Sequence, residues 1–205
     1  MTDRSETIRQ LLRQGPTSVR QLTDIMGISQ PTISRAMKAL GDEVVRIGTG
    51  PSIHYVLRDA FRGFSSAPIY RITEEGQVKP LGRLIPVYPD GFVMEQTDNV
   101  CLHSDGLPWW LFDMRPQGYL GRAYASRDAS ELGLPANPEN WADSDVIRAL
   151  LAHGHDAVGN LLIGEQARNH FVEMPLPVAV DRAMAYPSLA LAVSSGAAPG
   201  SSAGG

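Results

Sequence analysis

The sequence predicts a mixed α/β protein of the α+β kind, in which a small helical head precedes a larger body led by strands. Residues 4–40 hold three apolar stretches at helical spacing, and two short β-patterned runs follow them. From residue 67 the pattern changes to strand-like runs separated by Pro, Gly and Asp. The charge divides in the same region: residues 1–58 hold 8 Lys+Arg and 5 Asp+Glu, whereas residues 59–205 hold 10 and 17. This charge distribution suggests that only the basic head contacts the phosphates of a nucleic acid.

Two short helices open the head. Apolar residues share one face of the first predicted helix, residues 4–13. The second is predicted over residues 19–26, where apolar residues again recur at helical spacing and Thr17 or Ser18 can supply the cap. Gly27 can adopt a left-handed backbone without a Cβ clash, so we expect it to end this second helix.

The third predicted helix, residues 30–40, is the element around which the head is organised. Ser29 can cap it, and Pro31 falls in its first turn, where a missing N–H costs nothing. Its apolar side chains recur at i, i+3, i+4 and i+7 and predict a buried stripe: Ile33, Ala36, Met37 and Leu40. The other face is polar and basic, and no acidic residue opposes it. This pattern is typical of the second helix of a helix-turn-helix, which enters the major groove of DNA.

Two short strands, residues 44–47 and 53–57, follow the helices and are joined by a turn over residues 48–52. Three helices and then a hairpin predict a winged helix-turn-helix domain over residues 1–60, with that turn at the tip of the wing. The alternative is a winged helix that contacts a protein, and the basic face of the third helix favours DNA.

Seven side chains of the head are the candidate DNA contacts. The candidates for base or groove contacts are Gln30, Thr32, Ser34 and Arg35. The candidates for phosphate contacts are Lys38, Arg46 and Arg20. Because a single winged helix buries little surface, two half-sites read by a homodimer would give useful specificity. Double-stranded DNA is therefore the expected partner, with a homodimer as the expected binding form.

The body is predicted as a mixed, β-rich domain over residues 67–186, joined to the head by a linker or short crossover over residues 59–66. Turn residues divide residues 69–95 into strands that fit a meander. Pro187 is placed for the first turn of a short last helix. Residues 187–205 are therefore predicted as this short helix followed by a Gly/Ser-rich tail, residues 196–205, which is expected to be flexible.

Inside the body, the apolar block LPWWLF of residues 107–112 is expected to be core. A helix is expected to reach residue 126, before a stretch rich in turn formers over residues 127–140. Another helix is predicted over residues 144–153, and a short strand over residues 158–163.

Composition excludes several classes of protein. No apolar run is long enough to span a bilayer, and the N-terminus lacks the apolar core of a secretory signal, so we expect a cytoplasmic protein. Cys101 is the one cysteine, which excludes an internal disulfide and a cysteine metal cluster. The run HGHD, residues 153–156, brings two histidines close together and could suggest a metal site, but no third ligand lies at a recognisable spacing. A helix end stabilised by imidazole is the favoured interpretation, with no metal.

The run ISQPTISRAMKAL, followed by RIGTGPSIHYVL, resembles the winged-helix heads of bacterial repressors. The resemblance implies the winged-helix fold more specifically than it implies any operator sequence. No Cys/His metal-sensing cluster occurs in the helical stretches, so metal-responsive repression is not expected.

A second resemblance extends beyond the head. The run HDAVGNL, residues 155–161, is similar to the "dDavGaL" run of the HipA-like serine/threonine kinase toxins, and here too it follows a helix containing Leu-Leu. LPWWLFDMRPQGYLGRAYA lies where that family has its "lp.ffdglLPeg" segment, and the tail PGSSAGG resembles the start of its glycine-rich, ATP-cradling loop. Some members carry a winged-helix head in the same order. The chain therefore resembles the N-terminal part of such a kinase.

The resemblance implies that the kinase core is absent from these residues. In HipA-like kinases the ATP-binding lysine, the catalytic Asp and the magnesium-binding Asp all lie after the glycine-rich loop, and this chain stops inside that loop. Ser201 and Ser202 would correspond to serines of an incomplete loop. We therefore expect no catalytic residue and no cofactor in this chain, since ATP and Mg²⁺ are implied only for a full-length kinase.

Two functions follow from these patterns. The first is a DNA-binding regulator, formed by a truncated or split HipA-like toxin–antitoxin component without kinase residues. The second is an interaction module that docks on a separately encoded HipA-like kinase, or the N-terminal fragment of such a kinase. An enzyme in its own right is disfavoured, because no base, nucleophile and positioned partner can be assembled from these residues.

Overall fold

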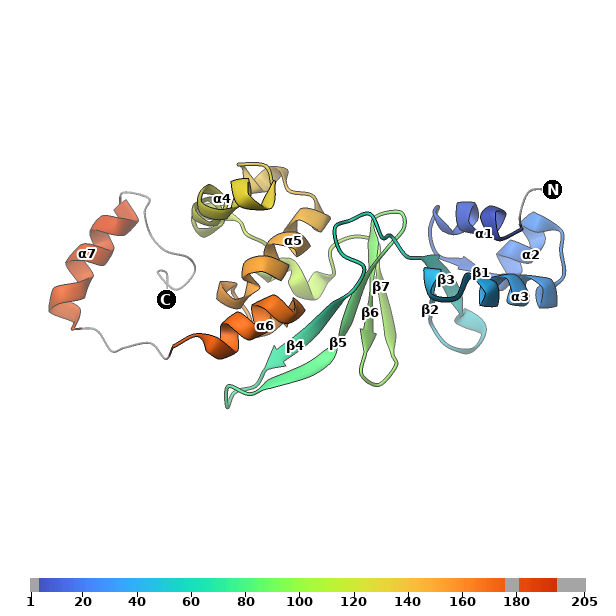
Figure 1. The fold of residues 1–205 in the computed structure, drawn as a ribbon, viewed down its shortest axis with the longest axis horizontal. Coiled ribbons are helices and arrows are strands. Elements are labelled where there is room, and N and C mark those ends of the chain that lie inside the picture. Colours follow the sequence, from blue (N-terminus) through green and yellow to red (C-terminus); the bar gives the residue numbers. More distant parts are fainter. Residues whose placement is uncertain (1–3, 176–180, 195–205) are drawn as a thin grey trace. The chain divides into compact units, whose positions relative to one another are not determined.

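The computed structural model of the chain describes residues 4–175 and 181–194, and Figure 1 shows its helices and strands. The predicted fold class is confirmed, because a helix-turn-helix region is followed by a region of mixed helices and sheet. The predicted Gly/Ser-rich tail lies outside the described residues.

The chain forms two compact units. Unit 1 comprises Met1–Pro68 and Pro80–Trp109, and unit 2 comprises Ile69–Lys79 and Trp110–Gly205. Unit 1 therefore contains the head together with residues 80–109, which follow it in the sequence. The sequence-based boundaries near residues 60 and 187 stay predictions about independently folding domains.

Three helices form the head of unit 1: α1 (Arg4–Leu12), α2 (Val19–Met26) and α3 (Gln30–Leu40). Ser18 caps α2 with a complete capping box, because its Oγ accepts from the Gln21 backbone N–H while the Gln21 side chain accepts from the Ser18 N–H. Gly27 ends α2 in the left-handed conformation, with φ 64°. Both expectations for α2 are confirmed.

The expectation that Ser29 caps α3 is wrong in its detail. Ser29 occupies the N-cap position, but its side chain makes no capping hydrogen bond. Its Oγ instead lies 3.0 Å from the hydroxyl of Thr32. The backbone carbonyl of Ser29 accepts from the N–H groups of both Thr32 and Ile33, so the first turn of α3 closes through the main chain.

The wing is an antiparallel sheet with strand order β1-β3-β2, built from β1 (Thr17–Ser18), β2 (Val44–Ile47) and β3 (His54–Leu57). The two strands predicted for the wing are confirmed, and β1 is an addition. Short 3-10 helices, η1 (Gly41–Glu43) and η2 (Gly50–Ser52), flank β2. At Gly48, φ is 78° and an added Cβ would lie 2.4 Å from the Ser52 carbonyl oxygen, so the wing requires glycine there.

The core of the head lies between the three helices and β3. The stripe predicted on α3 is largely confirmed, because Ile33 is fully buried and Met37 and Leu40 are nearly so, while Ala36 is half-buried. The other buried members of this core come from α1, α2 and β3: Ile8, Leu12, Leu22 and Leu57.

Four further strands follow, β4 (Ala67–Ile72), β5 (Val78–Val87), β6 (Gly91–Gln96) and β7 (Cys101–Ser104). Within unit 1, β5 pairs antiparallel with β6, and β6 with β7. Within unit 2, the N–H of Thr73 donates to the carbonyl of Gln77 and closes the tight turn between β4 and β5. The predicted meander is confirmed.

A second core joins the wing strands to β5 and β6 inside unit 1. Its buried side chains are Val45, Ile47, Val56, Ile85, Val87 and Val93. The wing sheet therefore packs against one core on each of its two faces. Leu57 belongs to the core of the helices, and its neighbour Val56 belongs to this second core. The head and strands β5–β7 thus share apolar packing.

Unit 2 surrounds a short strand, β8 (Leu161–Ile163), which pairs antiparallel with β4. Its helical elements are η3 (Trp109–Met114), α4 (Gly118–Leu132), η4 (Pro138–Asn140), α5 (Asp143–His153), η5 (Gly154–Asp156), α6 (Gly164–Glu173) and α7 (Arg182–Ser194). The predicted helix over residues 144–153 is confirmed as α5. The predicted strand is shorter than expected, because Val158 is exposed and lies before β8.

Helix α4 extends further than predicted. The stretch after residue 126 was expected to form turns, but α4 continues to Leu132 and ends at Gly133, whose φ is 64°. Ala125, Asp128 and Ala129 are buried along this helix, and Arg127 pairs with the Asp128 carboxylate at 2.8 Å. Burial of one helix face and this ion pair outweigh the weak helix propensity of Ser and Asp.

The expectation that LPWWLF is core is wrong for half of the block. Trp109 is 77% exposed and Phe112 is 55% exposed, whereas Leu111 and Met114 are buried. Residues 109–112 of the block lie in the 3-10 helix η3, in which residues three apart share a face, so Trp109 and Phe112 lie in solvent while Leu111 and Met114 are buried.

The last helix also begins earlier than predicted. Helix α7 starts at Arg182, and Pro187 lies inside it rather than in its first turn. Asp181 supplies the cap, because its Oδ1 accepts from the Ala183 N–H at 2.8 Å. Among the described residues, no helix combines the length and the apolar character needed to cross a membrane.

Candidate nucleic-acid interface

Helix α3 presents its polar side to solvent. Gln30, Ser34, Arg35 and Lys38 are exposed, while the opposite side of the helix is buried in the core of the head. Thr32 is half-buried and its hydroxyl faces Ser29, so it is the least accessible of the candidate base contacts. The Nε of Arg35 donates to the Pro31 carbonyl at 3.3 Å, which holds the guanidinium along the helix surface.

Two of the candidate contacts outside α3 lie on neighbouring elements of the head. Arg20, in the first turn of α2, shares a shallow depression with Val19, Thr23 and Gln30, so the structure brings Arg20 and Gln30 together. Arg46 is exposed on β2 between the buried Val45 and Ile47, on the outer side of the wing. Within residues 4–175 and 181–194, no hydrogen bond or ion pair joins Arg46 to the side chains of α3.

The candidate cations are not neutralised by the protein. Within residues 4–175 and 181–194, no carboxylate forms an ion pair with Arg20, Arg35, Lys38 or Arg46. Arg9 provides the contrast, because it donates to Glu43 at 2.8 Å and to Glu6 at 3.1 Å. These hydrogen bonds raise the pKa of Arg9, and the one from Arg9 lowers the pKa of Glu43. Cations without carboxylate partners are the ones available to phosphate.

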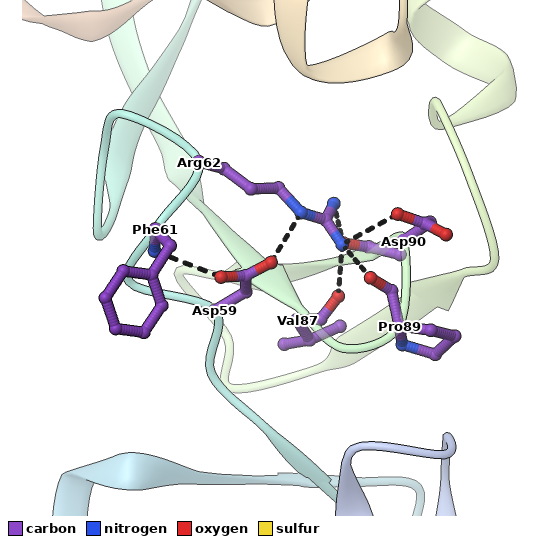
Figure 2. Close-up of polar contacts among 7 residues, drawn as sticks. Asp59, Phe61, Arg62, Val87, Pro89 and Asp90 are labelled. Atoms are coloured by element: carbon purple, nitrogen blue, oxygen red, sulfur yellow. Dashed lines mark hydrogen bonds and ion pairs between the residues drawn. The ribbon is translucent and has the colours of Figure 1, made fainter.

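A buried arginine fastens the segment after the wing to the turn between β5 and β6. Figure 2 shows the Arg62 guanidinium between the Asp59 carboxylate and the carbonyl groups of Val87 and Pro89. Its Nε donates to Asp59 at 2.8 Å, and its Nη2 donates to Val87 at 2.8 Å and to Pro89 at 2.7 Å. We call these four residues the Arg62 clamp.

Further contacts complete the Arg62 clamp. Arg62 Nη1 donates to the Gly91 carbonyl at 3.0 Å, and the guanidinium lies 5.3 Å from the centre of the Phe92 ring. Asp59 accepts from the Phe61 N–H at 3.0 Å, which is drawn in Figure 2. The segment predicted to be a linker is therefore held in place within unit 1. Opposite charges at i and i+3, Asp59 and Arg62, were the sequence signal for this contact.

The other residues considered for chemistry do not assemble into a site. Cys101 is half-buried, and burial raises the pKa of its thiol, which disfavours the reactive thiolate. His155 lies between His153 and His170, with ring centres 6.3 Å and 4.9 Å away. In the described part of the chain, no group of three or more His, Cys, Asp or Glu residues could hold a metal ion.

His54 is the first residue of the last wing strand. Its ring is half-buried at the start of β3, and Nδ1 lies 3.0 Å from the Ser52 carbonyl oxygen. The imidazole is thus used to close the wing turn.

Comparisons with known proteins agree with the helix-turn-helix geometry and add a family for the body. Residues 3–43 match the family described as bacterial regulatory protein, arsR family. Residues 64–172 match the family described as YjjJ-like toxin, middle domain. The toxin YjjJ of Escherichia coli (strain K12) is 34% identical over 199 residues, which cover 95% of this chain and 45% of that protein. No solved structure matches significantly.

These matches support the expected toxin-like identity at a coarser level than the HipA-like kinase resemblance. The chain carries a helix-turn-helix of a regulatory family followed by a toxin-family domain, and it spans less than half the length of its curated relative. Because the toxin-family match covers more than half of its residues, the chain belongs to the YjjJ-like toxin family.

Proposed function

We propose that the chain is a DNA-binding regulator of the toxin–antitoxin kind, in which α3 enters the major groove of a duplex site. The observation that carries the proposal is the exposed basic surface of α3 and its neighbours, where Arg20, Arg35, Lys38 and Arg46 form no ion pair with a carboxylate among the described residues. Neutralising phosphates with such cations releases counterions and drives binding. The alternative, a winged helix that contacts a protein, would not need this uncompensated charge.

Each candidate residue has a distinct role in this proposal. Gln30, Ser34 and Arg35 contact base edges or the groove, and Thr32 contributes through its half-exposed side. Three cations contact the phosphates on either side: Lys38, Arg46 and Arg20. Two copies of the chain bind two half-sites, because one winged helix buries too little surface for specific binding.

Binding is tested by fluorescence anisotropy with duplex DNA from upstream of the gene for this chain. Arg35→Ala should weaken specific binding by about 1–3 kcal/mol, the range for a lost bidentate base contact. Arg71→Ala, an exposed arginine on β4, is the matched control and should leave affinity unchanged. Equal affinity of the wild-type chain and Arg35→Ala, together with indifference to salt, would contradict the proposal.

We also propose that these 205 residues act without phosphoryl transfer, as a truncated or split component of a HipA-like system. The supporting observation is that the chain spans 45% of the length of the toxin YjjJ, so the relative holds further residues that have no counterpart here. The alternative is a module that docks on a separately encoded HipA-like kinase. Incubation with labelled ATP and Mg²⁺ should give no phosphorylated chain, and a clear signal would overturn this proposal.

The DNA that follows codon 205 separates the remaining alternatives. A continuation with kinase motifs, in frame or after a frameshift, favours a fragment or a split gene. An unrelated gene at that position favours a regulator that acts alone.

A further inference from the structure

Strand β7 lies at the edge of its sheet (Figure 1). Among the described residues it pairs with β6, and no ladder joins its other side to a further strand. The turn before it sets the hydrogen-bonding pattern, because the Gln96 N–H donates to the Val100 carbonyl at 2.8 Å. Hydrogen-bonded and non-hydrogen-bonded pairs alternate along an antiparallel ladder, so the main-chain groups of Cys101 and His103 point away from β6. The outer edge of β7 therefore presents the N–H and carbonyl groups of both residues.

The two faces of β7 differ in how they are covered. Cys101 packs against the core that the wing shares with β5 and β6, so the wing covers this face. On the other face Leu102 is 45% exposed, and Val100, just before the strand, is 46% exposed. Met94, the partner of Leu102 on β6, is only 3% exposed. An apolar surface that is buried on β6 thus continues uncovered onto β7.

The edge of β7 lacks the features that prevent pairing with other strands. Natural proteins protect exposed edges with charged residues, Pro, bulges or very short strands. The wing edges follow this rule, because β1 has two residues and β2 carries the exposed Arg46. Residues 100–104 contain no Lys, Arg, Asp, Glu or Pro. Burial lowers the pKa of His103, so its imidazole is neutral at pH 7. The edge of β7 is thus open to pairing with another strand.

The sequence of this edge is complementary to a second copy of itself. When two β7 strands pair antiparallel with Leu102 on the twofold axis, Cys101 of each copy lies opposite the partner's His103. All the outward main-chain groups of both residues are then hydrogen-bonded. Leu102 faces the partner's Leu102 in a non-hydrogen-bonded pair, in which the side chains approach most closely.

The charges at the ends of the paired strands agree with this arrangement. Asp98 would lie opposite the partner's Gly106, and Asp105 opposite the partner's Asn99. Like charges directly opposite each other would destabilise a cross-strand pair, and none meet here. We propose that β7 is the surface through which two copies of the chain associate, with Leu102 at the centre of the interface. This surface supplies the homodimer of the proposed function, and its role in DNA binding rests on that function.

Sedimentation velocity of the full chain without DNA tests the interface. A short edge pairing buries less than the roughly 1,200 Å² of a standard interface, so the wild type should form dimers only as its concentration rises. Leu102→Lys, which places two ammonium groups on the axis, should stay monomeric. Val172→Lys, which changes an exposed apolar residue of α6, is the matched control and should associate as the wild type does. A monomeric wild type, or a Leu102→Lys variant that dimerises equally well, overturns the proposal.

A disulfide cross-link tests the arrangement of the two strands. In a Cys101→Ser background, Leu102→Cys places two thiols on the axis, and mild oxidation should give a linked dimer on a non-reducing gel. Val100→Cys in the same background is the control, because its two thiols would lie about 13 Å apart along the ladder, too far for a disulfide. Equal cross-linking of the two variants, or none in Leu102→Cys, overturns the proposed interface.

Fluorescence anisotropy with the upstream duplex separates this inference from the proposed function. A wild type that dimerises and cross-links through β7 but does not bind the duplex contradicts the proposed function alone. A wild type that binds the duplex but neither dimerises nor cross-links contradicts the β7 interface alone. If both hold, Leu102→Lys should bind the duplex more weakly than Val172→Lys, because paired copies gain affinity from two linked half-sites.

Discussion

Two arginines of unit 1, Arg62 and Arg35, differ in how fully the protein satisfies their guanidinium groups. In the Arg62 clamp, one guanidinium meets a carboxylate and three backbone carbonyls, and its side chain is 10% exposed. On the head, Arg35 is exposed, and among the described residues its side chain donates to the Pro31 carbonyl of its own helix and pairs with no carboxylate. The comparison teaches that residue type alone does not reveal a role: a guanidinium whose donors are used stabilises the fold, and one whose charge is uncompensated is available to a ligand.

The Arg62 clamp also has a consequence for the head. It fixes the segment after the wing to the β5–β6 turn, next to the core that the wing strands share with β5 and β6. The head is therefore supported by residues that lie about 25–29 positions further along the chain. We therefore expect that variants which disrupt these strands also weaken DNA binding by α3.

The largest expected effect is a loss of stability when the guanidinium of Arg62 is removed. Arg62→Ala leaves the Asp59 carboxylate buried without its partner, so the free energy of unfolding should fall by about 3–5 kcal/mol. Urea unfolding followed by circular dichroism measures the change. Arg83→Ala is the matched control, because Arg83 pairs with Glu95 at the surface of the same strands and such pairs contribute about 0–1 kcal/mol. Equal losses in the two variants would contradict a structural role for the clamp.

A smaller effect is expected on the exposed side. Lys38→Ala should leave the free energy of unfolding within about 0.5 kcal/mol of the wild type, because the side chain lies in solvent. It should weaken DNA binding and reduce the slope of log K against log salt by about 0.9, the value for one lost phosphate contact. Lys79→Ala, on β5, is the matched control. A slope identical to that of the wild type would remove Lys38 from the phosphate contacts.

The smallest expected effect is a pH dependence of stability that comes from a buried histidine. In the described structure, Nδ1 of His155 is buried and makes no hydrogen bond. Burial, followed by the nearby His170, lowers the pKa of His155, and Asp156 opposes that shift while His153 and Arg127 add to it. Because the lowered pKa means that the unfolded chain binds the proton more tightly, stability should be full above about pH 6.5 and fall as the pH drops below it.

His155→Gln tests this dependence. Melting temperatures of the variant should change less between pH 7 and pH 5 than those of the wild type. His54→Gln, which removes a half-buried histidine of the wing, controls for the loss of any imidazole. A wild-type protein that is equally stable across this range would contradict the prediction.

The sequence predicted best where the determinants are local. The three helices of the head, the capping box at Ser18 and the turn at Gly27 follow from side chains within four residues of each other. The same local reasoning was wrong for Ser29, for α4 beyond residue 126 and for LPWWLF. In each of these, packing or main-chain hydrogen bonding overrode the intrinsic preference of the residue.

The sequence by itself determined the helix-turn-helix, its polar face and the alternation of short strands, because periodicity and capping act over one or two turns of chain. Only the tertiary structure decided that Arg62 is a buried clamp, that the wing shares a core with β5 and β6, and that β7 is an edge with an exposed leucine. These features depend on which distant residues meet, and on how completely their side chains fill the space between them. Neither quantity is encoded in the spacing of residues along one segment.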